Sequence, residues 1–211
     1  MKNLSRIVVA LFAVVCMQSA TAGIISDYSK ATAASEGWTI VHADGFGTGF
    51  DLEAVLTGHA AGTEFAFASS TSAGAATYDL FGSTFLNLLD IKGSGQTNST
   101  TFADDAYWYW NDLVSGGFGS VGFADSSYIT QGQADTASGD LRMSWHTMGT
   151  DGMTYGGWRS GSNTGLNSNN TWQRYVLVRS AAAPEPSVIG LMFMALVGMG
   201  LSRRTRRTHH A

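Results

Sequence analysis

The segment AYWYW, residues 106–110, indicates most directly how this chain of 211 residues folds. Side chains of a β-strand alternate between two faces, so a strand here places both tyrosines on one face and both tryptophans on the other. One face can fill a core. The second is either covered by loops or displayed as a flat platform on which the apolar face of a sugar ring stacks. The candidate ligand-platform residues are Tyr107, Trp108, Tyr109 and Trp110.

Short runs of similar character recur along the chain and predict further strands. They are rich in aromatic or β-branched residues, several are bounded by glycine or by Ser and Thr clusters, and they lie at 38–42, 52–56, 65–67, 78–81, 120–123, 141–147 and 172–178. Eight or more short strands predict an all-β fold, a single jelly-roll-like β-sandwich. The segment 84–91 fits a helical turn as well as a strand, and both alternatives remain open.

The composition between the two ends of the chain supports an all-β fold. Residues 23–183 contain no proline and 23 of the 26 glycines, and they are poor in Lys, Glu and Arg. Abundant Thr, Ser, Asn and aromatic residues are typical of strands and turns. The glycine-containing segments 44–49 and 92–95 and the polar segment 161–170 are predicted loops. The small residues 181–183 are a predicted linker.

The first 22 residues have the organisation of a secretory signal peptide. A basic start precedes the apolar run 7–17, which as a helix of about 16 Å is too short for a hydrocarbon core of about 30 Å. Ala20 and Ala22 place small residues at the two positions that a signal peptidase must accommodate, so we predict a mature chain that begins at Gly23. The single cysteine, Cys16, belongs to the signal, which leaves the mature chain without a disulfide or a cysteine-based metal site.

The C-terminal end carries a second targeting pattern. Pro184-Glu185-Pro186 is followed by Val188–Leu201, a run of 14 apolar or glycine residues, and then by a basic cluster. The basic residues are Arg203, Arg204, Arg206 and Arg207. As a helix the run is about 21 Å long, short for a stable anchor, and the arginines favour a cytoplasmic position for its far end. After cleavage of the signal, such a tail holds the protein in the membrane with its body outside.

This C-terminal pattern resembles the PEP-CTERM sorting domain over residues 184–207. The resemblance implies an exosortase-type processing enzyme as a partner, in Gram-negative bacteria that make extracellular polysaccharide. It also implies transient anchoring in the inner membrane before the protein reaches the cell surface or the extracellular space. Methionines replace some of the usual leucines and four residues follow the arginines; an ordinary membrane anchor is the alternative. We therefore divide the chain into a signal helix (1–22), a β-sandwich body (23–183) and a sorting signal with a hydrophobic helix (184–211).

The body is strongly acidic once the two ends are set aside. Six of the 12 Lys and Arg residues and one of the 16 Asp and Glu residues lie in the terminal segments, so the body carries 6 basic and 15 acidic residues, a net charge of −9. Such a surface repels nucleic acid and anionic lipid, which excludes nucleic-acid binding.

No catalytic signature is present in the body. Its histidines, His42, His59 and His146, do not form a His-Glu-x-x-His zinc helix, and neither a Gly-x-Ser-x-Gly elbow nor a phosphate-binding glycine loop occurs. We expect neither enzymatic activity nor a cofactor, although triads and carboxylate pairs form in space without a sequence spacing.

Two arginines accompany tryptophans near the end of the body. Arg159 follows Trp158, and Arg174 follows Trp172 by two positions. We predict that both arginines pair with carboxylates or stack on these indoles and so fix the last strand. The functional alternative is an arginine presented to an acidic sugar.

Three carboxylates surround the first glycine loop. Asp44, Asp51 and Glu53 could supply oxygen ligands to calcium, but an Asp-x-Asp-x-Asp-Gly spacing is missing. A solvated acidic loop is the simpler interpretation, and we expect no metal.

Two hypotheses about function follow. The first is an exported carbohydrate-binding or matrix protein at the cell surface, with extracellular polysaccharide as its partner. The second is an extracellular glycan-active hydrolase of jelly-roll type, which needs two carboxylates facing each other across a groove.

Overall fold

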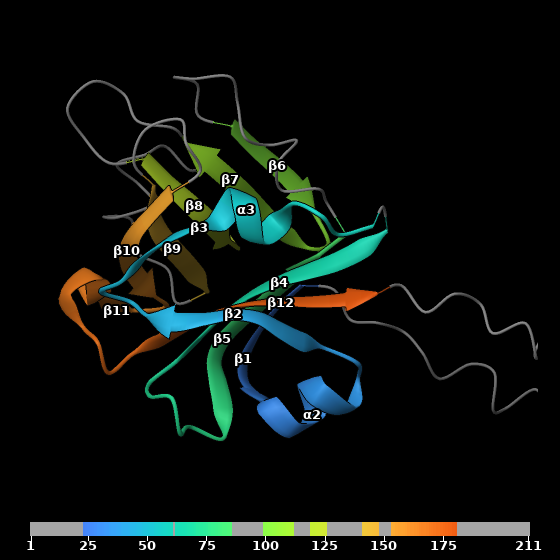
Figure 1. Ribbon diagram of the computed structural model, residues 1–211, viewed down its shortest axis with the longest axis horizontal. Coiled ribbons are helices and arrows are strands. Elements are labelled where there is room, and N and C mark those ends of the chain that lie inside the picture. Colours follow the sequence, from blue (N-terminus) through green and yellow to red (C-terminus); the bar gives the residue numbers. More distant parts are fainter. Residues whose placement is uncertain are drawn as a thin grey trace, which may run out of the picture. The chain divides into compact units, whose positions relative to one another are not determined.

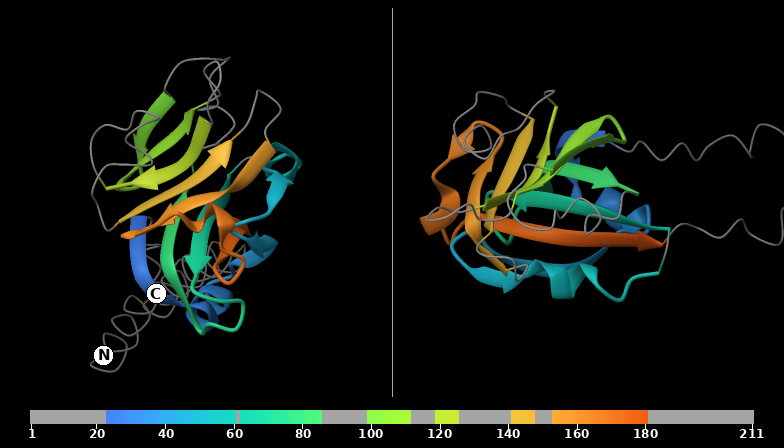
Figure 2. Two further views of the ribbon diagram at one scale, coloured as in Figure 1. Left: turned by 90° about the vertical axis from the view of Figure 1, so that its left-hand side faces the viewer. Right: turned by 90° about the horizontal axis from the view of Figure 1, so that it is seen from above.

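The computed structural model describes residues 23–60, 62–85, 99–111, 119–125, 141–147 and 153–180, which form two antiparallel β-sheets and a few short helical segments (Figures 1 and 2). The predicted all-β class is confirmed. The chain divides into two compact units, Met1–Arg179 and Ser180–Ala211. The predicted signal helix and hydrophobic tail helix lie outside the described residues.

The first sheet combines the two ends of the body. Its five strands lie in the order β1, β5, β4, β12, β2, so the last strand sits inside the sheet next to strands from the first half of the chain. Their bounds are β1 (Gly23–Ser29), β5 (Thr77–Thr84), β4 (Thr63–Ser70), β12 (Gln173–Ser180) and β2 (Thr39–Gly45).

The second sheet is built from the middle of the chain. It runs in the order β11, β10, β9, β8, β7, β6, and the short strand β3 also pairs with β10. The bounds are β3 (Gly49–Asp51), β6 (Ser99–Ala103), β7 (Ala106–Asn111), β8 (Gly119–Ala124), β9 (Arg142–Thr147), β10 (Met153–Ser160) and β11 (Asn163–Thr164).

The two sheets share one aromatic core. The ring of Phe67 in β4 lies 4.4 Å from that of Trp145 in β9 and 5.9 Å from that of Trp108 in β7, and all three side chains are fully buried. Gly82 in β5 makes room for Phe123 of β8, since a Cβ atom at position 82 would lie 2.6 Å from that ring. We refer to this cluster as the shared core.

A smaller cluster lies on the opposite face of the first sheet. There Tyr175 and Leu177 of β12 pack with Phe81 of β5 and with Ala33 and Trp38. Ala33 belongs to α2 (Lys30–Ser35), a short helix that begins where the Ser29 hydroxyl accepts a hydrogen bond from the Thr32 backbone N–H. Both faces of the first sheet are therefore covered.

The prediction of a strand at 52–56 was wrong, because this segment is the helix α3 (Leu52–Leu56). Asp51 accepts a hydrogen bond from the backbone N–H of Ala54 and so caps the helix, while Leu52 and Leu56, four residues apart, are buried on one face. A capping carboxylate and an i, i+4 apolar pair outweighed the β-like composition.

The other predicted strands fall within β2, β4, β5, β7, β8, β9 and β12, except that the predicted strands 38–42, 141–147 and 172–178 each begin one residue before the observed strand. The predicted loop at 161–170 contains β11 and a short 3-10 helix (Leu166–Ser168). In the ambiguous segment 84–91, Thr84 ends β5, and 86–91 lie outside the described residues, as do 92–95 and 181–183. Strands β1, β3, β6 and β10 were not predicted.

Candidate functional site

The structure places the tryptophans of β7 inside the molecule. Trp108 and Trp110 are fully buried in the shared core, and Tyr109 is fully buried on the other face of the strand, where its hydroxyl donates to the Met143 carbonyl. Tyr107 is half-buried, and its ring lies 4.7 Å from that of Phe102 in β6. The predicted alternation is confirmed, but the interpretation of this strand as an exposed aromatic platform is corrected, because its tryptophan face closes the space between the sheets.

Arg174 fixes the last strand from within the core. Its guanidinium is fully buried, donates to the Thr48 carbonyl and lies 4.6 Å from the Phe50 ring centre and 5.6 Å from that of Trp145. Burial lowers the pKa of Arg174 to about 10, with Asp44 opposing the shift, so the group remains charged at neutral pH. Arg174 contacts aromatic rings as predicted in kind, but these rings are Phe50 and Trp145, whereas the prediction named Trp158 and Trp172.

Arg159 is 3% exposed, and its Nε and Nη2 atoms donate to the Gly161 carbonyl over 2.9 and 2.7 Å. The alternative in which Arg159 or Arg174 is presented to an acidic sugar is therefore wrong, because neither guanidinium reaches the surface.

Two of the three acidic loop residues accept hydrogen bonds from backbone N–H groups. Asp44 accepts a hydrogen bond from the Gly45 N–H over 2.7 Å, and Asp51 caps α3. Asp44, Asp51 and Glu53 are all described, and the described residues contain no group of three metal-ligating side chains, so the three do not assemble as a calcium site. Nearby, His42 stacks on Phe50 at 3.8 Å between ring centres, and burial, followed by the charge of Arg174, lowers the pKa of His42.

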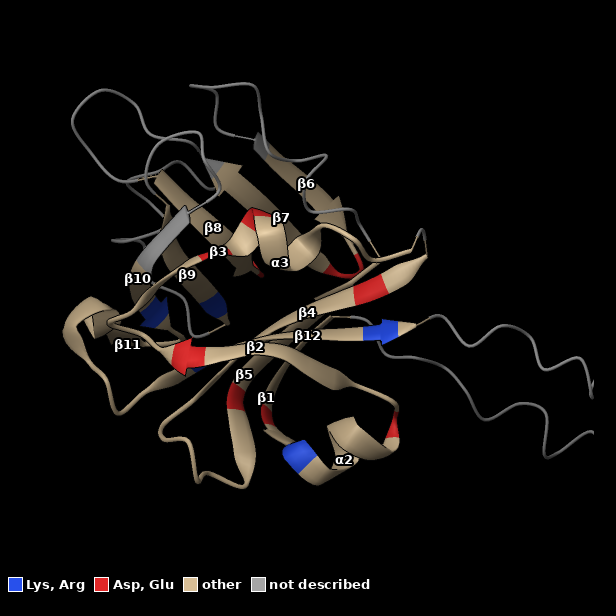
Figure 3. Cartoon of the chain, in the orientation of Figure 1, with Lys and Arg blue, Asp and Glu red and all other residues tan. Residues whose placement is uncertain are grey.

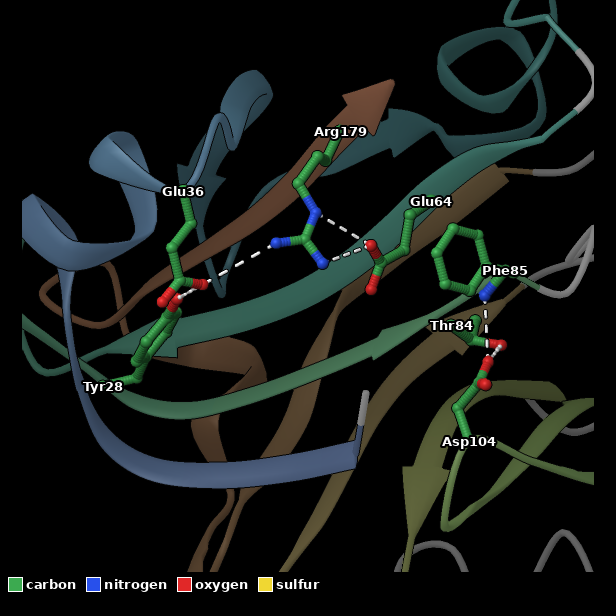
Figure 4. A network of polar contacts seen from close by, with 7 residues as sticks. All are labelled: Tyr28, Glu36, Glu64, Thr84, Phe85, Asp104 and Arg179. Carbon is green, nitrogen blue, oxygen red and sulfur yellow. Dashed lines mark hydrogen bonds and ion pairs between the residues drawn. The ribbon is translucent and has the colours of Figure 1, made fainter. Parts of the chain in front are cut away.

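A polar network that the sequence did not suggest lies at the end of β12 (Figure 4). Arg179 donates through Nε and Nη2 to one oxygen of Glu64 in β4, and its Nη1 lies 3.7 Å from a carboxylate oxygen of Glu36. The guanidinium also lies 4.6 Å from the centre of the Trp38 ring. Glu64 is only 1% exposed, so this is a buried ion pair at the point where the chain leaves the sheet.

The Tyr28 hydroxyl extends this network by donating to Glu36 over 2.6 Å. Burial and this bond to a carboxylate raise the pKa of Tyr28. The network thus joins the strands β1, β4 and β12 to Glu36, the residue that follows α2. No sequence spacing could have revealed it, because Glu64 and Arg179 are 115 positions apart.

A second contact ties the two sheets together at the same end (Figure 4). Asp104 and Asp105, with φ of 52° and 58°, form the two-residue turn between β6 and β7. Asp104 accepts hydrogen bonds from the Thr84 hydroxyl over 2.7 Å and from the Phe85 N–H over 2.9 Å.

These contacts define one end of the first unit, which we call the terminal face. Thr84 pairs with Phe65, the residue after Glu64, and the neighbouring Ser83 pairs with Gly23, the first residue of β1. The terminal face therefore brings together Gly23, Glu64, Thr84, Asp104 and Arg179. The chain enters the first sheet and leaves it at this one end.

The targeting residues predicted from the sequence lie outside the described residues, with one exception. Gly23, the predicted mature start, is described. Those outside are Ala20, Ala22, Pro184, Glu185, Pro186, Arg203, Arg204, Arg206 and Arg207. Within the described ranges, no helix is long and apolar enough to span a membrane.

Positive charge is scarce on the described surface (Figure 3). The described basic residues are Lys30, Arg142, Arg159, Arg174 and Arg179. Arg142, Arg159 and Arg174 are at most 3% exposed, Arg179 is paired with Glu64, and the Lys30 ammonium donates to the Tyr175 hydroxyl. The acidic character deduced from composition is thus concentrated at the surface.

No protein-family model matches this chain, and no curated protein or solved structure shows significant similarity to it.

Proposed function

We propose that this chain is an exported protein of the cell surface or extracellular matrix, processed through a PEP-CTERM-like sorting signal. Its body is a jelly-roll-like β-sandwich that associates with carbohydrate or other matrix components. The observation that carries the proposal is the motif Pro184-Glu185-Pro186 followed by an apolar run and an arginine cluster.

The described strands are compatible with processing at both ends. Strand β1 is described from Gly23, so cleavage after Ala22 removes no described residue of the first sheet. Strand β12 ends at Ser180, four positions before Pro184, so removal of the tail at the motif also cuts no described strand. The buried pair of Arg179 with Glu64 holds β12 in place up to its second-to-last residue.

Charge narrows the class of matrix partner. An acidic surface whose described arginines are buried or paired disfavours anionic polymers, and a neutral or weakly basic polysaccharide is the better match. The proposal does not rest on Trp108 and Trp110, which belong to the shared core.

The hydrolase alternative lacks a supporting observation among the described residues. Glu36 and Glu64 converge in space, but they converge on Arg179, which neutralises them, and Glu64 is 1% exposed. A general acid and a nucleophile need access to substrate.

Mass spectrometry of the exported protein tests the sorting proposal. A native chain should begin at Gly23 and lack the tail, whereas replacement of Pro184-Glu185-Pro186 by three alanines should leave the start unchanged and retain the tail. Normal tail removal in that variant would contradict the proposal, because processing would then not depend on the motif.

A glycan pull-down tests the matrix proposal separately. The mature protein should bind neutral or weakly basic polysaccharides in preference to uronic-acid polymers. Failure to bind any polysaccharide would remove the carbohydrate part and leave the sorting part intact.

A further inference from the structure

Two of the four exposed large apolar side chains of the described part of the chain lie on the terminal face. These two are Phe85 and Phe102, at 47% and 59% exposure. Soluble proteins bury such side chains preferentially, and a gathering of them at one place marks a contact surface.

Both phenylalanines lie beside Asp104, at the turn that reaches the first sheet. Phe85 donates its backbone N–H to Asp104, and Phe102 lies two residues before Asp104 in β6. Ile40 and Val41, at 46% and 37% exposure, lie farther along the edge strand β2, where Ile40 pairs with Leu177 in the middle of β12, and they are not part of this face. The opposite end of β4 and β5 is the turn 71–76, whose exposed residues are small or polar.

Covalent continuity sets how far this face can lie from the membrane. Only eight positions separate Ser180, the last residue of β12, from Val188, the first of the apolar run. Because an extended chain spans at most about 3.6 Å per residue, this connection reaches about 29 Å at most. The N-terminal apolar run ends at Met17, six positions before Gly23. Both membrane-directed segments are thus attached to the same face by short connections.

The charges on this face distinguish the kind of lipid it suits. The described carboxylates of this face are Glu36, Glu64, Asp104 and Asp105, and its single described base is Arg179. Anionic lipid would be repelled by this excess of carboxylates, whereas a zwitterionic interface accepts aromatic and aliphatic side chains without that cost.

We infer that the terminal face rests on the lipid–water interface while the apolar tail is embedded, with Phe85 and Phe102 inserted among the headgroups. The inference rests on the proposed function, because it requires that the tail enter a membrane. It assigns the exposed side chains of Phe85 and Phe102 to the membrane-held stage that precedes release of the body.

Two matched cysteine variants test the inference in the chain from Gly23 to Ala211, the form expected after cleavage of the signal, which contains no cysteine of its own. Ala60 and Ala73 are both exposed loop alanines; the Ala60 carbonyl accepts the Thr63 N–H beside the terminal face, whereas Ala73 lies in the turn at the opposite end. Each variant, Ala60→Cys or Ala73→Cys, is labelled with a fluorophore and reconstituted through the tail into phosphatidylcholine vesicles containing a headgroup-nitroxide lipid.

Quenching should be several-fold stronger at position 60 than at position 73. It should fall to the level of position 73 when Phe85→Ser and Phe102→Ser are added, and it should weaken when phosphatidylglycerol replaces phosphatidylcholine at low salt. Equal quenching at the two positions overturns the inference, and this comparison does not need the serine variants. The inference is also overturned if the serine variants are folded and quenching at position 60 is unchanged in them.

Flotation of the same vesicles separates the two proposals. Protein that floats but shows equal quenching overturns the inference alone and leaves the sorting proposal standing. Protein that does not float overturns both, because the tail is then not a membrane segment.

Discussion

Replacing Arg179 with methionine should strongly destabilise the fold, although this residue is near the end of the body. Arg179→Met removes both hydrogen bonds to one oxygen of Glu64 and leaves a carboxylate that is 1% exposed without its counter-charge. Breaking a buried pair typically costs about 3–5 kcal/mol. Because the Arg179 side chain keeps 16% exposure, we expect the lower end, about 3 kcal/mol, and a melting temperature lower by about 6–12 °C.

Urea denaturation of three variants checks this value. Glu36→Gln removes the other carboxylate near the same guanidinium, but that contact is exposed and 3.7 Å long, so it should cost no more than about 1 kcal/mol. The double variant Glu64→Gln, Arg179→Met should be more stable than Arg179→Met alone, because it no longer buries an unpaired charge. If Arg179→Met costs no more than Glu36→Gln, the buried pair is not what holds β12 at this end.

Three further perturbations give distinct outcomes. Trp108→Ala should cost about 3–5 kcal/mol in chemical denaturation, as expected for a large cavity, whereas Phe102→Ala, at a side chain 59% exposed, should cost less than about 1 kcal/mol; similar losses would contradict the assignment of the core. Gly122→Ala should prevent normal folding, because its Cβ atom would lie 2.0 Å from a carbonyl oxygen of β9, while Gly74→Ala, with nothing within 4 Å, should keep a native circular dichroism spectrum and melting temperature. Finally, the pKa of His42 is lowered in the folded state from its ordinary value of 6.5, so the folded protein binds this proton less readily than the unfolded chain. Stability should therefore fall as the pH decreases below about 6.5. The variant His42→Gln should show a flatter dependence of melting temperature on pH between about pH 7.5 and 5, and parallel curves for the two proteins would contradict this.

Local pattern was enough to predict the fold class and most of the strands from the sequence. The alternation in residues 106–110 placed Trp108 and Trp110 together on one face of β7, as the structure confirms. It could not show which face meets the other sheet, because alternation gives relative orientation only. The exposed-platform interpretation failed for that reason.

The contacts of the terminal face could not be predicted from the sequence, for a different reason. Glu64 and Arg179 meet because β4 and β12 are neighbours in the first sheet, and Asp104 meets Thr84 where a turn of the second sheet reaches the first. Strand order is set by packing over long sequence separations, which neither composition nor periodicity encodes. The helix α3 could have been predicted, since Asp51 followed by Leu52 and Leu56 is a capped i, i+4 pattern.

The position of β12 also determines when the body can fold during synthesis. This strand lies between β4 and β2, so the first sheet stays divided until residue 180 has been made and, under the proposed function, has crossed the membrane. Pairings of such long sequence separation form late and slowly, so the preceding strands cannot complete this sheet by themselves. The apolar run begins only eight positions later, so if the tail enters the membrane as proposed, completion of the sheet and its arrival there should nearly coincide. Under the proposed function, the order of strands therefore delays folding of the first sheet until export is almost finished.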